Sequence, residues 1–85
     1  MSLTDKVAVV TGGGRGIGRG IVEQLLAQGA RVLIAQRQPL DEALGQNAKV
    51  TGLTVDLSRR EAPYEIASAV EQQLGGCDIL VNNAA

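Results

Sequence analysis

The chain has 85 residues, of which 45% are hydrophobic and 20% are charged, and its formal net charge is −1. A sequence of this size and balance forms at most one small soluble domain, which buries roughly 60–65% of the surface of its unfolded chain. The near-neutral charge, with basic residues scattered along the chain, provides no field for binding nucleic acid or an anionic membrane surface.

The residue types that are missing exclude several kinds of chemistry. Histidine is absent and cysteine occurs once, at Cys77. A zinc site therefore lacks ligands, and neither a Ser-His-Asp triad nor a Cys-His pair can form within the chain. The single cysteine is typical of a reducing compartment, and neither a membrane-length apolar run nor a signal peptide is visible. We therefore expect a cytoplasmic protein with no metal, and with neither nucleic acid nor a membrane as partner.

The first half of the chain reads as strand, helix, strand. Residues 7–10 form a continuous run of apolar, mostly β-branched side chains, which is typical of a parallel strand buried on both faces. Beyond a glycine-rich stretch the apolar period becomes that of a helix. The expected inward face of this helix consists of Ile17, Ile21, Val22, Leu25 and Leu26. Gly29 stands where a left-handed C-terminal cap belongs, and residues 31–36 predict a second buried strand.

The second half repeats this alternation with weaker signals. Residues 39–44 predict one or two helical turns, and residues 50–55 predict a third strand that Gly52 interrupts. A further helix follows, and after it residues 79–81 form a short apolar run that predicts a fourth buried strand.

The start of the helix before this last strand has two competing signals. Ser58 and Glu61 have the spacing of a capping box. If Ser58 were the N-cap, however, the ring of Pro63 would lie past the first turn and clash with a preceding carbonyl. We therefore expect the helix to begin near Pro63, to run to Leu74 and to end at Gly75. Its inward face would consist of Ile66, Ala69, Val70 and Leu74.

Strands and helices that alternate in this way form a parallel sheet with helical crossovers, so the fold class is α/β, a doubly wound parallel sheet of the Rossmann type. Right-handed crossovers would order the strands 3-2-1-4, with the ligand crevice at their carboxyl ends beside the first strand. The strand at 79–81 would then be an exposed hydrophobic edge, which natural proteins avoid. We therefore expect residues 1–85 to be the N-terminal part of a single dinucleotide-binding domain, truncated within the fold.

A glycine-rich loop after the first strand carries the strongest functional signal. Six of the 11 glycines lie between Gly12 and Gly20. They let the backbone turn tightly and approach a ligand closely, and the helix that follows offers N–H groups and partial positive charge to phosphate. The pattern Gly-x-Gly-x-x-Gly fits no register here. A mononucleotide P-loop would need lysine and a hydroxyl where Arg19 and Gly20 stand, which argues against ATP or GTP hydrolysis.

The pattern that fits is Thr-Gly-x-x-x-Gly-x-Gly, at residues 11–18. With it the sequence resembles the short-chain dehydrogenase/reductase family along its whole length, because two later landmarks are also similar. Val55-Asp56-Leu57 follows the third strand, and Asn82-Asn83-Ala84-Ala85 follows the fourth. Ala85 departs from the family's usual glycine.

The resemblance implies that the glycine loop holds the pyrophosphate of a nicotinamide dinucleotide. Gly12, Gly16 and Gly18 would wrap it, and Ile17 would contribute a backbone contact. It also implies an oxidoreductase that interconverts a small-molecule alcohol and a carbonyl compound, and a full-length protein that forms homo-oligomers.

Residues after the third and fourth strands would bind the rest of the cofactor, according to the same resemblance. Asp56 would accept a hydrogen bond from the adenine amino group, and Leu57 would meet the adenine ring through its backbone. Asn83 and Ala84 would lie along the adenosine ribose and the nicotinamide side.

Charge at the end of the second strand favours NADP(H) over NAD(H). A carboxylate there would bond the ribose 2′-hydroxyl and repel a 2′-phosphate, but this position is held by Gln36, and Arg37 follows it. Arg15, within the glycine loop, could reach the same phosphate, and guanidinium groups match phosphate geometry. Asp41 and Glu42 lie further on and would complicate this interpretation.

Several of these residues also have purely structural explanations. Asp56 could be a turn or N-cap carboxylate, and Arg15 and Arg37 could be solvated surface charges. Arg19 we interpret as a solvated surface charge only.

The family's catalytic residues are not among these 85. Its chemistry uses a Tyr-x-x-x-Lys pair with a nearby serine, and the lysine lowers the tyrosine pKa so that the phenol relays a proton. Tyr64 has Ser68 at that spacing and precedes the fourth strand.

Two alternatives to an NADP(H)-dependent oxidoreductase stay open. One is a non-catalytic nucleotide-binding module that needs a partner. The other is an S-adenosylmethionine-dependent methyltransferase, although Thr11 stands where that class usually has an acid.

Overall fold

The computed structural model of the protein describes residues 2–83. The elements in chain order are β1 (Val7–Thr11), α1 (Gly16–Ala27), β2 (Arg31–Gln36), α2 (Glu42–Gly45), β3 (Val50–Thr54), α3 (Ala62–Leu74) and β4 (Ile79–Asn82). None of these helices has the length and apolar character needed to cross a bilayer.

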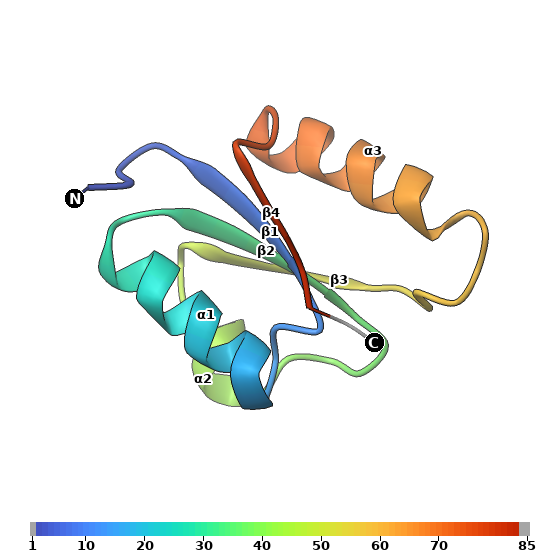
Figure 1. Cartoon of the computed structure of the whole chain (residues 1–85), viewed down its shortest axis with the longest axis horizontal. Coiled ribbons are helices and arrows are strands. Elements are labelled where there is room, and N and C mark those ends of the chain that lie inside the picture. The colour runs from blue at the N-terminus through green and yellow to red at the C-terminus, as the bar shows by residue number, and fades with distance from the viewer. Residues whose placement is uncertain (1, 84–85) are drawn as a thin grey trace.

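All neighbouring strands are parallel, and their order is β3-β2-β1-β4. This confirms the predicted order and the fold class. Helices α1 and α2 cover one face of the sheet and α3 covers the other (Figure 1). The change of face follows from the handedness of the crossovers. The chain moves one way from β1 to β3 and then returns past β1 to β4, so a right-handed connection places α3 on the opposite side.

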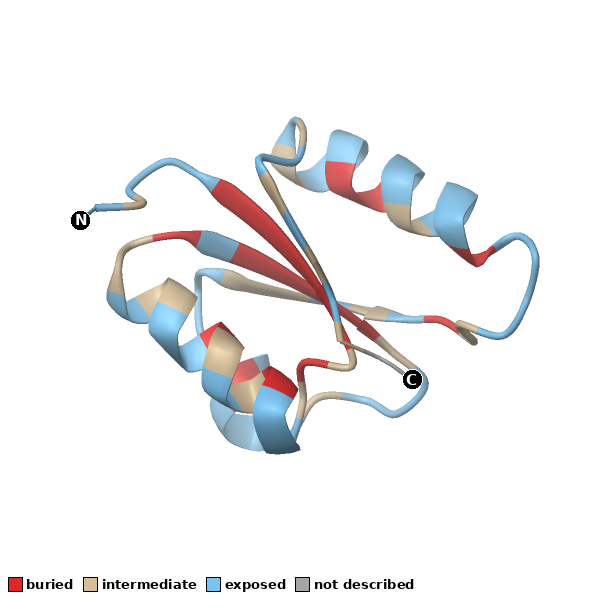
Figure 2. Ribbon diagram, viewed as in Figure 1, coloured by how far each residue is buried: buried red, intermediate tan, exposed pale blue. Residues whose placement is uncertain are grey.

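The core consists of two apolar layers, one on each face of the central strands. Every residue of β1 is buried, and so are the four central residues of β2 (Figure 2). Alternate side chains point to opposite faces, so Val9 packs in the layer under α3, whereas Val10 packs with Val22 of α1. Burial on both faces explains why these two strands read as continuous apolar runs.

Helix ends follow the predicted signals closely. Gly29 and Gly75 have positive φ angles of 96° and 83°, so both helices that precede them end in the left-handed conformation that glycine favours. Helix α3 begins at Ala62, with Pro63 in its first turn, as the competition with the capping box predicted. The predicted turns at residues 39–44 begin later, because the Asp41 carboxylate caps α2 by accepting a hydrogen bond from the backbone N–H of Leu44.

Strand β3 is continuous, which corrects the expected interruption at Gly52. Gly52 pairs in register with Ile34 of β2. The Leu40 side chain lies where a Cβ at this position would be, within 3.1 Å, so the glycine makes room for packing.

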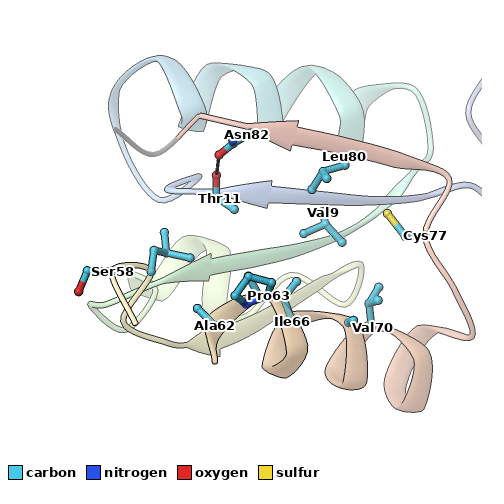
Figure 3. A pocket seen from close by; sticks show the side chains of 12 residues that line it. Val9, Thr11, Ser58, Ala62, Pro63, Ile66, Val70, Cys77, Leu80 and Asn82 are labelled. Atoms are coloured by element: carbon cyan, nitrogen blue, oxygen red, sulfur yellow. Dashed lines mark hydrogen bonds between the residues drawn. The ribbon is translucent and has the colours of Figure 1, made fainter. Parts of the chain in front are cut away.

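Two apolar residues are exposed, contrary to prediction. Ile17 is 81% exposed, because the inward face of α1 lies along Gly18 and Val22 instead. Strand β4 is an edge strand of the sheet, as predicted, but Leu80 is 67% exposed, so the strand is not buried on both faces. A cavity of about 550 Å³ lies between β1, β4 and α3, and Val9 and Leu80 line it (Figure 3). This cavity separates Leu80 from the helix.

Candidate nucleotide-binding site

A groove of about 400 Å³ lies at the carboxyl ends of β1, β2 and β3, the edge where doubly wound sheets bind ligands. The residues that line it are Gly12, Arg15, Gln36, Arg37, Gln38, Asp56, Leu57 and Ser58. The structure thus brings together Gly12, predicted to bind the pyrophosphate, and five residues predicted to bind the adenosine half of a dinucleotide, namely Arg15, Gln36, Arg37, Asp56 and Leu57. Gln38 and Ser58 also line the groove but were not predicted. Gly16, Ile17, Gly18 and Asn83 do not line this groove, and Ala84 lies outside the described residues.

The glycine loop turns sharply between β1 and α1. Gly12 and Gly16 have positive φ angles of 69° and 63°, which other residues adopt at a cost. Gly18 is buried in the first turn of α1, and a Cβ there would come within 3.0 Å of both the Gly12 carbonyl oxygen and the Asn83 side chain. The start of the helix therefore packs directly against the loop, and its N–H groups face the place where phosphate binds in such folds.

Asn83 holds the beginning of this loop from the end of β4. Its side-chain Nδ2 donates a hydrogen bond of 3.1 Å to the Gly12 carbonyl. Its backbone N–H donates to the Thr11 hydroxyl at 3.0 Å, and Thr11 also lies 3.3 Å from Oδ1 of Asn82 (Figure 3). Thr11, the first residue of the Thr-Gly-x-x-x-Gly-x-Gly pattern, thus connects the ends of β1 and β4.

Gln36 holds the middle of the loop from the end of β2. Its Oε1 accepts a hydrogen bond of 2.8 Å from the Gly14 backbone N–H, and its Nε2 donates to the Gln38 carbonyl at 2.9 Å. The amide that was predicted to lie beside the ribose is therefore bonded at both ends to backbone.

Of the two acids that would complicate phosphate binding, Asp41 is engaged elsewhere and Glu42 does not line the groove. Asp41 accepts hydrogen bonds from the Leu44 N–H, at 3.0 Å, and from the Arg19 guanidinium, and both lower its pKa, the Leu44 bond more. Arg19 also pairs with Glu23 at 3.2 Å. This corrects the interpretation of Arg19 as a solvated charge, because it links α1 to the N-terminus of α2. Arg15 and Arg37 are the exposed cations that line the groove.

Asp56 forms a turn with Ser58 at the start of the β3–α3 loop. Its Oδ1 accepts hydrogen bonds from the Ser58 hydroxyl, at 2.7 Å, and from the Ser58 backbone N–H, at 3.0 Å. These two bonds lower the pKa of Asp56, the hydroxyl bond most, and the nearby charges of Arg37 and Arg59 act in the same direction. The turn fixes an ionised carboxylate in the wall of the groove.

Removing the Ser58 hydroxyl should raise the pKa of Asp56 towards its ordinary value of about 4. The folded-state pKa lies below the unfolded one, so the bonds stabilise the fold above the unfolded pKa, and this stabilisation is lost as pH falls through the folded pKa. In Ser58→Ala this stabilisation should therefore be smaller, and its loss should be complete at a higher pH. A carbon-13 NMR titration of the Asp56 carboxyl measures the shift. Ser68→Ala, on the exposed side of α3, is the matched control, and an equal shift in that variant would contradict the assignment.

The described residues contain no catalytic constellation. Tyr64, the only tyrosine of the chain, is 77% exposed on α3 and does not line the groove. Within residues 2–83, no group of three or more His, Cys, Asp or Glu side chains could hold a metal ion.

Sequence comparison identifies relatives over nearly the whole chain. Residues 6–85 match the profile of the short chain dehydrogenase family. Galactitol 2-dehydrogenase of Agrobacterium fabrum is 43% identical over 91 aligned positions, which cover 100% of this chain and 34% of that protein. 3-Oxoacyl-[acyl-carrier-protein] reductase of Vibrio cholerae is 39% identical over 89 positions, which cover 99% of this chain and 36% of that protein. The chain thus spans about a third of the length of these relatives.

Solved structures agree with the sequence comparison. The crystal structure of L-sorbose reductase from Gluconobacter frateurii, in complex with NADPH and L-sorbose, matches with a TM-score of 0.85 at 34% identity, covering 100% of this chain and 35% of that one. A short-chain dehydrogenase structure from Novosphingobium aromaticivorans matches with a TM-score of 0.82 at 37% identity. The match covers 93% of this chain and 31% of the Novosphingobium chain. The family match also decides against a methyltransferase. This chain belongs to the short chain dehydrogenase family.

Proposed function

We propose that this chain is the cofactor-binding N-terminal segment of an NADP(H)-dependent oxidoreductase that interconverts an alcohol and a carbonyl compound. The observation that carries the cofactor choice is the charge of the groove. Arg15 and Arg37 line it, and no carboxylate stands at the end of β2. Asp41, the acid that follows in sequence, is bonded to Arg19 and Leu44. Two guanidinium groups, with no carboxylate at the end of β2, suit a 2′-phosphate.

The remaining residues of the site fit the other parts of a dinucleotide. A Cβ on Gly16 would meet no atom within 4 Å, so this part of the loop is open to close approach by a pyrophosphate. Asp56 and Leu57 line the opposite wall of the groove, where the Asp56 carboxylate would accept a bond from the adenine amino group. When bound, the cofactor supplies or accepts a hydride. The residues described here orient its adenosine and phosphate groups.

The chemistry at the substrate depends on residues beyond this segment. The proteins it resembles are named for reactions of alcohols or carbonyl compounds, namely galactitol, L-sorbose and 3-oxoacyl chains. Their greater length provides the room for a substrate pocket and for a tyrosine–lysine pair. We propose further that the whole enzyme is cytoplasmic and homo-oligomeric and acts on a small molecule.

Affinity measurements with adenosine fragments test the cofactor choice directly. The protein should bind 2′,5′-ADP at least about tenfold more tightly than 5′-AMP at low salt, where charge pairing is least screened. Arg15→Leu and Arg37→Leu should each remove most of this preference. Arg60→Leu is the matched control, because Arg60 is exposed and does not line the groove. Equal binding of NADPH and NADH by the unchanged protein would refute the NADP(H) assignment.

A further inference from the structure

Gly14 has no explanation in the family's glycine pattern. In Thr-Gly-x-x-x-Gly-x-Gly it occupies an unspecified position, and its φ angle is not positive, so the backbone conformation does not require glycine there. Glycine is needed because there is no space for a side chain at this position. A Cβ on Gly14 would come within 3.0 Å of three atoms of the Gln36 side-chain amide.

Gln36 is the reason for this close approach. Its Oε1 accepts the Gly14 N–H at 2.8 Å, and its Nε2 donates to the carbonyl of Gln38 at 2.9 Å. One amide therefore joins the β1–α1 loop to the β2–α2 loop. The two arginines of the groove come directly after the bonded residues, since Arg15 follows Gly14 and Arg37 follows Gln36.

We propose that Gln36 is a positioning residue that holds Arg15 and Arg37 at the separation a 2′-phosphate needs, and that Gly14 is glycine in order to admit its amide. This inference rests on the proposed NADP(H) function. Both polar atoms of the Gln36 amide are bonded to backbone, as a positioning residue requires. Fixing the loop before the ligand arrives lowers the ordering cost of binding.

Two variants that remove the bond by different routes provide the test. Gln36→Met has a similar length but no polar atom, and Gly14→Ala displaces the amide sterically. In both, the preference for 2′,5′-ADP over 5′-AMP should fall roughly five- to tenfold, the effect of one hydrogen bond, while the affinity for 5′-AMP itself changes less than about twofold. Because both changes break one contact, their effects should not add in the double variant. Gln24→Met and Gly20→Ala, on the exposed face of α1, are the matched controls.

Amide hydrogen exchange at position 14, without any ligand, gives a readout that is independent of the cofactor. Exchange of the Gly14 N–H should accelerate at least about tenfold in Gln36→Met. Gln36→Glu retains an acceptor and should keep this amide protected, while its carboxylate repels the 2′-phosphate. Unchanged exchange in Gln36→Met, or an unchanged preference for 2′,5′-ADP, would overturn the proposal. Equal binding of the two nucleotides by the unchanged protein would instead refute the NADP(H) function, and amide exchange would still show whether Gln36 holds the loop.

Discussion

Leu33→Ala should lower the free energy of unfolding by about 2–5 kcal/mol, the cost of a cavity left by a buried leucine. Leu33 is fully buried at the centre of β2, in the apolar layer under α3. A chain of 85 residues has a total stability of only about 4–13 kcal/mol. The variant should therefore lose a large part of its stability, which denaturant unfolding followed by circular dichroism measures.

Leu80→Ala is the matched control for this experiment. It deletes the same side chain from the same sheet, but Leu80 is 67% exposed on β4. We expect a change within about 0.5 kcal/mol, as for other surface substitutions. A loss in Leu80→Ala as large as that in Leu33→Ala would show that the α3 face is covered in solution.

Gly18→Ala should disrupt the glycine loop and lower nucleotide affinity by at least about tenfold. A Cβ at this position would come within 3.0 Å of the Gly12 carbonyl, and backbone yields less readily than the end of a side chain. Relieving the contact would displace the Asn83 amide from Gly12 and move the first turn of α1. The cost in stability should be about 1–3 kcal/mol, typical of overpacking. Titration calorimetry with NADPH and thermal unfolding measure the two effects.

Gly20→Ala, two residues further along the same helix, separates the steric effect from the general effect of adding a methyl group. A Cβ on Gly20 meets no atom within 4 Å. Alanine is the better helix former, so this variant should gain up to about 1 kcal/mol and bind NADPH unchanged. Normal NADPH affinity in Gly18→Ala would contradict the close approach of helix and loop.

The features of the fold that the sequence predicted correctly are those that depend on neighbouring residues. The runs at β1 and β2 are continuous because both strands are buried on both faces, and Gly29 and Gly75 end their helices locally. The strand order followed from alternation and handedness alone. The predicted burial of Ile17 and Leu80 was wrong. Exposure depends on what packs over a side chain, and the residue type alone does not show this.

The candidate site also has features that the sequence predicted and features that it did not. The residues that line the groove follow strand ends, so their grouping was predictable from the topology. The hydrogen-bond and ion-pair partners of the residues around the site were not predictable. Gln36 and Gly14 are 22 residues apart, as are Arg19 and Asp41, and neither pairing leaves a local pattern. The contact of Asn83 with Gly12 joins residues 71 apart. Only the packing of the strands brings such pairs within reach.

The position of β4 beside β1 has a consequence for the order in which the chain folds. Strand β1 gains its second neighbouring strand only when β4 joins the sheet. Just before β4, the Asp78 carboxylate accepts a hydrogen bond from the backbone N–H of Val7, which is 71 residues away in the sequence. Such distant pairings are slow to form, because their closure entropy is paid before any contact is gained. Asn83 follows β4 in the chain, so its hydrogen bond to the Gly12 carbonyl forms only after β1, β2 and β3 have been made. The beginning of the phosphate loop is therefore held from this side only after β4 has joined the sheet.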